Sequence, residues 1–150
     1  MIIRIHHTGL VVRDIYSHYR TYMSHLFPES ILGPLIHDPL QKVNAVFIAT
    51  PPGCIELIEP ASDDSPISQT AKEHPAGFHH VCLEVTDLGK QLQLCKAAGQ
   101  YIVSPPQPAI AYGGRHIAFV MGEDRLLWEL LDAYNENPYK ERETLSQIDR

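Results

Sequence analysis

The alternation of apolar and polar residues along the chain predicts short strands and two amphipathic helices. Strands are predicted at 2–12, near 35–37, and at 43–50, 54–59, 78–86, near 101–103, 115–121 and 126–132. Apolar residues at helical spacing predict helices over 15–26 and 88–98. Each helix follows an aspartate, Asp14 or Asp87, whose side chain can accept a hydrogen bond from a free backbone N–H of the first turn. The order βαβββ therefore occurs twice.

The two occurrences form an internal repeat. When the chain is shifted by 73 residues without a gap, IHHTGLVVRDI at 5–15 falls on FHHVCLEVTDL at 78–88. The identical pairs in this frame are His6/His79, His7/His80, Leu10/Leu83, Val12/Val85, Asp14/Asp87, Ala45/Ala118, Glu56/Glu129 and Leu57/Leu130. The sequence therefore predicts a duplicated βαβββ unit, with module 1 at about 1–66 and module 2 at about 77–134.

The remaining segments are predicted to connect these elements. Loops and hairpin turns are expected at 28–40, 51–53, 104–113 and 122–125, where proline, glycine and acidic residues gather. The polar linker over 60–77 includes Ser65-Pro66, which can open a short helix over 66–73. The modules together form one domain over 1–134, and 135–150 is expected to be a C-terminal tail.

Two glutamates stand within strongly apolar strands, Glu129 in LLWELL and Glu56 in CIELI. Burying an isolated carboxylate is costly unless it is paired or bound to a metal ion. Each glutamate follows a histidine of the repeat, His7 or His80, by 49 residues. Because neighbouring strand residues point to opposite faces, only one histidine of each His-His pair can face a given cavity. The repeat alone does not decide which one.

Two such units packed about a pseudo-twofold axis would bring two imidazoles and two carboxylates together. This donor set suits a divalent metal ion acting as a Lewis acid. We therefore predict a metal site made of Glu56, Glu129 and one histidine from each pair. The histidines outside the repeat are predicted to be surface or loop residues, and they are His18, His25, His37, His74 and His116.

Composition narrows the possible partners. A chain of 150 residues with 44% hydrophobic residues can form one domain with a useful core. The net charge of -6 and the scattered placement of the 12 lysines and arginines argue against nucleic acid. No stretch approaches the roughly 18 apolar residues of a membrane span. The three cysteines, Cys54, Cys82 and Cys95, include no CxxC pair, so we expect buried thiols in a protein of the reducing cytoplasm.

The strands IHHTGLVV and FHHVCLEV, together with CIELIEP and LLWELLD, resemble the vicinal oxygen chelate superfamily. That superfamily includes glyoxalase I, methylmalonyl-CoA epimerase, extradiol dioxygenases and bleomycin-resistance proteins, and the resemblance covers about 1–133. The runs IELIEPASDDSPI at 55–67, AGFHHVCLEVTDL at 76–88 and AYGGRHIAFV at 111–120 most resemble the methylmalonyl-CoA epimerases.

The resemblance implies an α+β fold in which two tandem βαβββ modules, related by a pseudo-twofold axis, form a half-open mixed β-barrel with a metal site. It selects the second histidine of each pair, so the implied ligands of one Co, Ni, Mn or Zn ion are His7, Glu56, His80 and Glu129. It further implies an isomerase that epimerises a 2-methyl-branched acyl-CoA by α-proton abstraction through a metal-stabilised enolate. Glu129 is the expected catalytic base, and a homodimer is the expected assembly.

Two other functions remain open at this point. A glyoxalase I-like lactoylglutathione lyase, acting on a glutathione hemithioacetal, uses the same ligand set. A drug-sequestering binding protein of this superfamily would carry out no chemistry, but that class usually lacks the four ligands. Two features depart from the epimerases: the strand VNAVFI at 43–48 offers no second carboxylate, and Met121-Gly122-Glu123-Asp124 replaces their His-Pro-Lys turn.

Overall fold

The computed structural model describes residues 1–50 and 53–134. The first two residues of the turn predicted at 51–53, and the tail predicted over 135–150, lie outside the described residues.

The chain folds as two compact units. The first unit is His7–His79, and the second unit is Met1–His6 together with the chain from His80 onward. The divisions fall within two long strands, β1 (Ile2–Val12) and β6 (Ala76–Val85). Each of these strands therefore contributes residues to both units.

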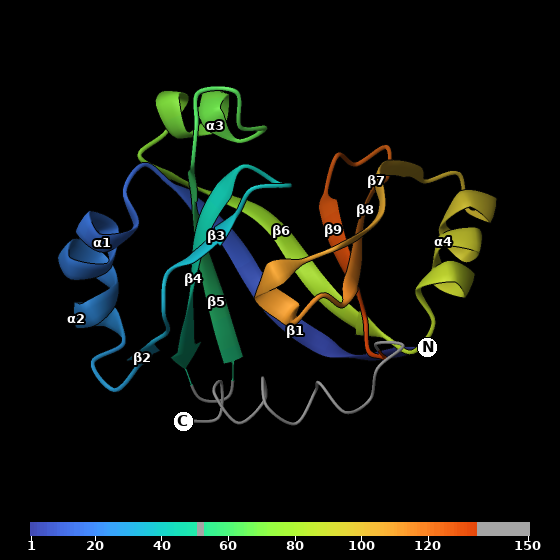
Figure 1. Ribbon diagram of the computed structural model, residues 1–150, viewed down its shortest axis with the longest axis horizontal. Helices are drawn as coiled ribbons and strands as arrows, with labels where there is room; N and C mark the ends of the chain where they lie inside the picture. Colours follow the sequence, from blue (N-terminus) through green and yellow to red (C-terminus); the bar gives the residue numbers. More distant parts are fainter. Residues whose placement is uncertain (51–52, 135–150) are drawn as a thin grey trace. The chain divides into compact units, whose positions relative to one another are not determined.

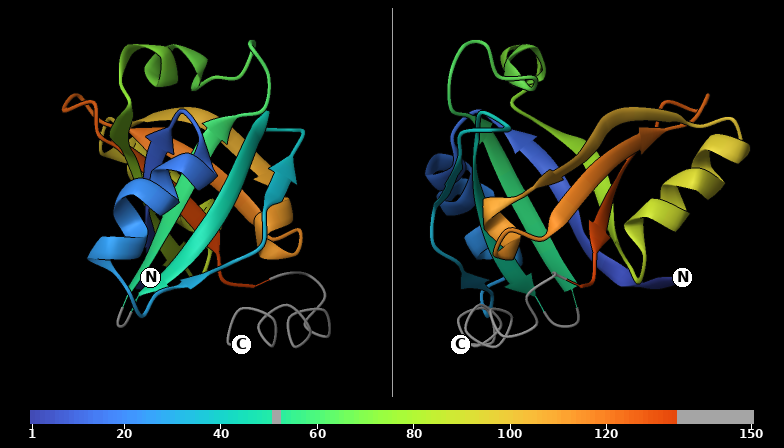
Figure 2. Two further views of the ribbon diagram at one scale, coloured as in Figure 1. Left: turned by 90° about the vertical axis from the view of Figure 1, so that its left-hand side faces the viewer. Right: turned by 45° about the vertical axis from the view of Figure 1, so that its right-hand side comes forward.

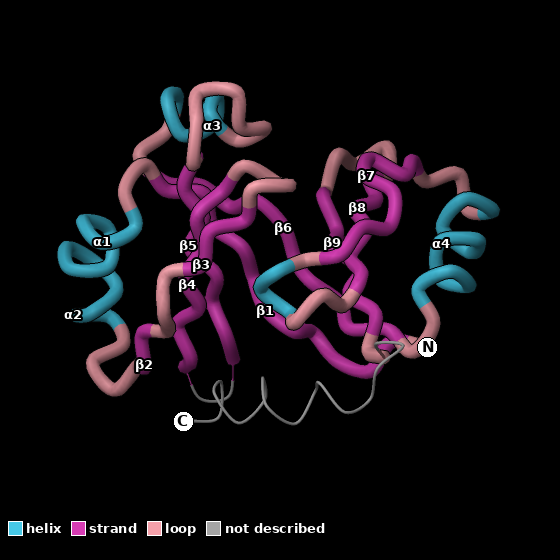
Figure 3. Tube along the Cα trace, viewed as in Figure 1, coloured by secondary structure: helices cyan, strands magenta, loops and turns pink. Residues whose placement is uncertain are grey.

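The first unit carries one helical segment before its hairpin and one short helix after it, in the predicted order (Figures 1 and 3). After β1 it contains α1 (Ile15–His18), a π-helical turn (Tyr19–Met23), α2 (Ser24–Leu26), β2 (Ile31–Leu32), β3 (Ile36–Asp38), β4 (Val43–Thr50), β5 (Gly53–Pro60) and α3 (Ser68–Glu73). The short helix predicted in the linker is thus present as α3. The strand predicted near 35–37 is β3, and β2 was not predicted.

The helical segment of the first unit begins at its predicted cap. The Asp14 side chain accepts a hydrogen bond from the Ser17 N–H at 2.6 Å, which satisfies one of the free donors of the first turn. Ile15 and Met23 face the sheet, and Figure 2 shows α1 and α2 lying against β4 and β5. The buried core there comprises Val12, Ile15, Met23, Val46, Ile48 and Leu57. The π-helical turn was not predicted, because an apolar stripe does not distinguish an α turn from a π turn.

The second unit repeats this plan with a single helix. It contains β6, α4 (Leu88–Ala97), β7 (Tyr101–Pro108), a 3-10 turn (Ile110–Tyr112), β8 (His116–Met121) and β9 (Leu127–Asp132). Asp87 caps α4 by accepting a hydrogen bond from the Lys90 N–H at 2.9 Å. The helix covers a core made of Val85, Leu88, Leu92, Ala118, Val120 and Leu130.

Strand β7 is longer than predicted, because it continues through the first half of the proline-bearing stretch 104–113 that was expected to be a loop. Its pairing with β8 is irregular, with register shifts between Ile102 and Ser104 and between Ser104 and Gln107. β7 lies at one end of the strand order, and prolines are tolerated at a sheet edge because no partner needs their missing N–H.

The described strands form one mixed nine-stranded sheet in the order β2-β4-β5-β1-β6-β9-β8-β7, with β3 paired to β4. The predicted α+β class is therefore confirmed. The module boundaries, the pseudo-twofold axis and the half-open barrel stay predictions. Among the described residues, no helix has the length and apolar character needed to cross a membrane. Of the three cysteines, all within the described residues, Cys82 is buried as expected, whereas Cys54 and Cys95 are half-buried.

Both units pair their first and last strands in parallel and in the same register. In the first unit Gly9 of β1 lies opposite Glu56 of β5, and in the second Cys82 of β6 lies opposite Glu129 of β9. These two pairs are related by the 73-residue shift of the sequence repeat. The 73-residue shift that aligns the histidines and glutamates therefore also relates the parallel strand pairs that carry these residues.

The hairpins do not follow that frame. Phe47 of β4 lies opposite the glutamate of the first unit, and Phe119 of β8 lies opposite that of the second. These phenylalanines are related by a shift of 72 residues, so the second hairpin is one residue longer. The match of Ala45 with Ala118 in the gapless alignment is therefore wrong as a structural equivalence.

Candidate metal centre

In the first unit, an imidazole and a carboxylate lie side by side in the sheet. His7 is in β1 and Glu56 is in β5, two strands that pair in parallel. The distance between His7 Nε2 and Glu56 Oε2 is 3.1 Å. The residues are only 2% and 7% exposed, so the carboxylate has little access to water. A carboxylate buried to this extent needs a polar or charged partner.

The second unit contains the same pair. His80 is in β6 and Glu129 in β9, and the distance between His80 Nε2 and Glu129 Oε2 is again 3.1 Å. These residues are 2% and 3% exposed. The repeated register of the parallel strands thus builds the same donor pair, at the same separation, in both units.

An aromatic ring packs edge-on against each imidazole. The ring centroids of His7 and Phe47 are 5.3 Å apart with an interplanar angle of 81°. Those of His80 and Phe119 are 5.7 Å apart with an angle of 88°. The edge-to-face contact restricts the rotation of each imidazole and keeps its surroundings apolar. The gapless repeat hid this pair of phenylalanines, which a shift of 72 residues reveals.

Together the four side chains His7, Glu56, His80 and Glu129 could bind a metal ion. Two imidazole nitrogens and two carboxylate oxygens suit zinc, manganese, cobalt and nickel alike. Two ligand atoms at about 2.1 Å from one ion lie about 3.0 to 3.4 Å apart. The separation of 3.1 Å within each pair has this value. The donor set therefore fits a divalent ion without selecting one.

The structure also distinguishes the two histidines of each pair. His7 and His80 lie beside a glutamate, whereas His6 and His79 are half-buried. The His6 ring meets the Tyr112 ring edge-on, with centroids 5.5 Å apart. Of the five histidines predicted to be surface or loop residues, His18 is half-buried, and the other four are exposed: His25, His37, His74 and His116. Burial lowers the pKa of His18.

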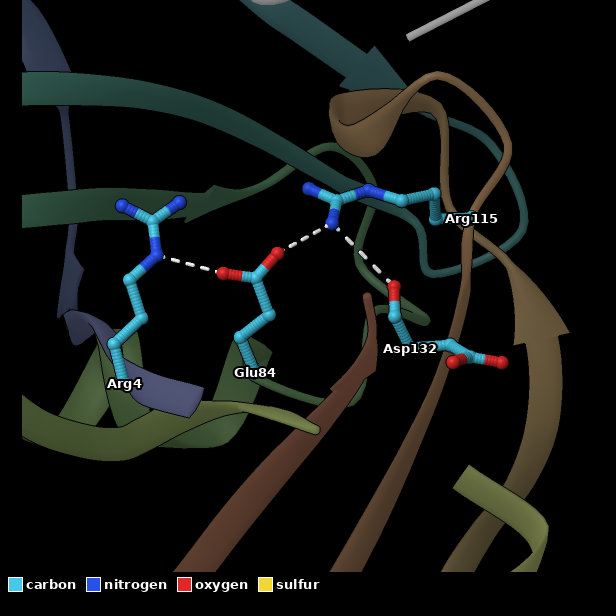
Figure 4. Close-up of polar contacts among 4 residues, drawn as sticks. All are labelled: Arg4, Glu84, Arg115 and Asp132. Atoms are coloured by element: carbon cyan, nitrogen blue, oxygen red, sulfur yellow. Dashed lines mark hydrogen bonds and ion pairs between the residues drawn. The ribbon is translucent and has the colours of Figure 1, made fainter. Parts of the chain in front are cut away.

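An ion cluster around the buried Glu84 in the second unit was not predicted (Figure 4). Glu84 of β6 lies between two arginines, with Arg4 Nε at 2.6 Å from Oε2 and Arg115 Nη1 at 2.7 Å from Oε1. Arg115 Nη1 also donates to the Asp132 carbonyl at 3.4 Å. Burial raises the pKa of the Glu84 carboxyl. The hydrogen bonds from Arg4 and Arg115 lower this pKa by more than burial raises it, so the pKa lies below its ordinary value. The sequence held one indication of this cluster: the 73-residue shift aligns the charged Glu84 with the apolar Val11.

We expect Glu84→Gln to destabilise the protein by roughly 1–3 kcal/mol at neutral pH, because two partly buried charge-assisted hydrogen bonds are weakened. The folded-state pKa of Glu84 is lowered, so its contribution is complete above the unfolded-state pKa of about 4.3 and is lost as the pH falls through the folded-state value. Denaturant unfolding of both proteins between pH 8 and 3 measures this. The difference should shrink below about pH 4.3.

Exposed Glu123 provides the matched control. Glu123→Gln should change the free energy of unfolding little at any pH in this range. A difference between wild type and Glu84→Gln that stays constant or grows on acidification would contradict the stabilising role of the ionised carboxylate.

Comparison with known proteins identifies relatives across most of the chain. The family model described as Glyoxalase/Bleomycin resistance protein/Dioxygenase superfamily matches residues 6–119. An ethylmalonyl-CoA/methylmalonyl-CoA epimerase of Cereibacter sphaeroides is 31% identical over 125 residues, which cover 83% of this chain and 92% of the relative.

Solved structures agree with this result at the level of the fold. The methylmalonyl-CoA epimerase from Mycobacterium tuberculosis matches with a TM-score of 0.77 and 21% identity, over 90% of this chain and 91% of that one. A methylmalonyl-CoA epimerase in complex with methylmalonyl-CoA and NH4+ matches with a TM-score of 0.69 and 20% identity, over 92% and 100% of the two chains.

Proposed function

Because this chain belongs to the glyoxalase/bleomycin resistance protein/dioxygenase superfamily, we propose that it is a metal-dependent epimerase of 2-methyl-branched acyl-CoA thioesters. The observation that carries the proposal is the repeated His–Glu pair, buried in both units with the same 3.1 Å separation. The 31% identity to an ethylmalonyl-CoA/methylmalonyl-CoA epimerase supports this choice of substrate class.

In this proposal His7, Glu56, His80 and Glu129 hold one divalent ion, with cobalt, nickel, manganese and zinc as the candidates. When bound, the ion would act as a Lewis acid toward the oxygen atoms of the substrate, which makes the neighbouring C–H bond more acidic. The two imidazoles and Glu56 serve as ligands. The edge-on phenylalanines keep the imidazoles oriented and the site apolar.

Glu129 is assigned the proton transfer. Its carboxylate removes the α-proton as a general base, which leaves a planar α-carbon. Strand β4 offers no acidic side chain from Val43 to Ile48. In this mechanism the same carboxylate therefore returns the proton, after the α-carbon has turned its other face toward Glu129. Return of the proton to the second face inverts the configuration.

A glyoxalase I-like lyase is the second candidate, and the same feature of β4 favours it. One carboxylate suffices to carry a proton between two adjacent carbons on a single face of the substrate, so such a reaction needs no second base. The proposed ligand set is also the one expected for that enzyme.

Proton exchange in deuterated water separates these candidates. The metal-loaded protein is incubated with methylmalonyl-CoA, and separately with the hemithioacetal of methylglyoxal and glutathione. We expect deuterium at the α-carbon of the CoA thioester and no thioester product from the hemithioacetal. The opposite result would establish the lyase instead. Inertness toward both substrates, with metal bound, would favour a binding protein and refute the epimerase.

We also expect metal affinity to fall between pH 8 and 5. The two ligand imidazoles must be neutral to bind, and the reference pKa of histidine is about 6.5. Below that pH each imidazole that has to lose a proton weakens binding by up to about tenfold per pH unit. Competition titrations with a chromophoric chelator at several pH values measure the affinity. A curve that is flat over this range would rule out His7 and His80 as ligands.

A further inference from the structure

We propose that Tyr112 is a positioning residue for Glu129, and that an ion cluster of Arg4, Glu84 and Arg115 holds Tyr112 in place. The inference rests on the proposed function, because it concerns the carboxylate that transfers the proton. It assigns a role to the AYGGR stretch at 111–115, which the ligand set leaves unexplained.

The contact between Tyr112 and Glu129 is buried. Tyr112 is 6% exposed, and its hydroxyl donates toward Glu129 Oε2 at 3.5 Å. The same oxygen lies 3.1 Å from His80 Nε2. A distance of 3.5 Å is long for an O–H···O hydrogen bond, but contacts at catalytic groups often shorten when substrate binds. The phenol and the imidazole thus approach one carboxylate oxygen and restrict how the carboxylate can rotate.

The backbone around Tyr112 requires the two glycines that follow it. Gly113 has a φ of 65° and Gly114 has a φ of 85°, and residues other than glycine rarely adopt these backbone angles. This conformation lets the Gly114 N–H donate to the Ala109 carbonyl at 3.0 Å and the Arg115 N–H donate to the Tyr112 carbonyl at 3.2 Å. The turn therefore fixes where the tyrosine stands at the end of its 3-10 turn.

The ion cluster fixes the arginine that follows the turn. Arg115 has a side chain only 13% exposed, and its guanidinium carbon lies 6.0 Å from the centroid of the Tyr112 ring. Its position is set by the bond to Glu84, which Arg4 holds from the other side (Figure 4). A guanidinium held in this way cannot swing away from the ring without leaving a buried carboxylate less compensated. The cluster thus supports Tyr112 through Arg115.

The first unit has an apolar arrangement at the position of this cluster. Val11 lies opposite Ile58 in β5 as Glu84 lies opposite Leu131 in β9, so the repeat makes Val11 the counterpart of Glu84. Val11 is 1% exposed and packs in a core that comprises Ala45, Ile58, Ile67 and Ala71. The 72-residue shift that relates β4 to β8 sets Leu40, which has no hydroxyl, against Tyr112. The duplicated chain therefore differs around its two glutamates, and the difference favours Glu129 over Glu56 for proton transfer.

Tyr112→Phe tests the proposal, because it removes the hydroxyl and keeps the ring. Hydrogen-bond partners of metal ligands typically contribute about 10- to 100-fold to metal affinity or activity. We expect the dissociation constant for Co²⁺ to rise by roughly this factor, and kcat for α-proton exchange to fall similarly with KM unchanged. KM should not change because Tyr112 acts through Glu129 and does not touch substrate.

Half-buried Tyr19 in the first unit provides the control, and Tyr19→Phe should change neither quantity. Wild-type values of both quantities in Tyr112→Phe would overturn the inference, and so would a rise in KM alone. This outcome differs from failure of the proposed function, in which the wild type itself would bind no metal or exchange no α-proton.

A double-mutant cycle tests the supporting role of Arg115. Arg115→Met should act in the same direction as Tyr112→Phe, and the double variant should lose no more than the worse single variant. Losses that add would show that the arginine does not act through the tyrosine. Arg115→Lys keeps the charge and should restore part of the metal affinity, which a variant that merely folds poorly would not show. Unfolding midpoints of all variants verify that they are folded when measured.

Discussion

Glu129→Gln is expected to lose α-proton exchange by on the order of 10² or more, while it keeps the fold and part of its metal affinity. Glutamine has nearly the same shape and retains one oxygen that can coordinate a metal ion. It cannot accept the α-proton as a carboxylate does. Glu129 is 3% exposed, so bulk water has little access to replace the carboxylate as the base. The rate of deuterium incorporation into methylmalonyl-CoA, measured with the variant fully loaded with metal, tests this expectation.

Glu56→Gln is the matched control, since it makes the same change in the same strand register of the other unit. We assign Glu56 a ligand role alone, so its replacement should weaken metal binding and reduce exchange far less once metal is saturating. Exchange by Glu129→Gln at the wild-type rate would mean that the base lies elsewhere. Equal losses in both variants would contradict the separate roles given to the two glutamates.

His80→Ala is expected to reduce the metal content of the purified protein from about one ion per chain to a small fraction of that value. The imidazole is buried and its Nε2 lies 3.1 Å from Glu129 Oε2, so its removal takes away one donor and leaves a buried carboxylate with less compensation. His7→Ala should have the same effect, because His7 has the same relation to Glu56. Elemental analysis after reconstitution and desalting gives the metal content directly.

His79→Ala is the informative control. His79 precedes His80 in β6 and is half-buried, and neighbouring residues of a strand point to opposite faces. The His79→Ala variant should therefore retain the wild-type metal content. Equal metal content in wild type and His80→Ala would refute the ligand assignment, and loss of metal in His79→Ala alone would shift the assignment to the first histidine of the pair.

Much of the fold could be predicted from the sequence because local patterns and the repeat agreed. The strands and the two capped helices follow from alternation, helical spacing and the positions of Asp14 and Asp87. The pairing of each histidine with a glutamate followed from two observations, a charged residue in an apolar strand and a repeated spacing of 49 residues. The first observation depends on burial being costly for a carboxylate, and the second depends only on the duplication of the sequence.

The elements that were missed depend on interactions between strands. The one-residue difference between the hairpins is invisible in a gapless alignment, so Phe47 and Phe119 were not recognised as equivalent. The part of β7 that follows residue 103 was predicted to be a loop because its prolines mark turns in most settings, whereas at a sheet edge they are tolerated. The cluster around Glu84 brings together residues 80 and 31 positions apart in the chain, and no local pattern predicts such pairings.

Titration of metal-free protein with Co²⁺, while deuterium incorporation into methylmalonyl-CoA is followed, tests most directly whether the four buried side chains form one functional metal site. We predict that the rate of exchange rises in proportion to the added metal and levels off at about one ion per chain. His80→Ala, titrated in parallel, should show little exchange at the same metal concentrations. Exchange that is equally fast without metal and in the presence of a chelator would contradict the proposed function.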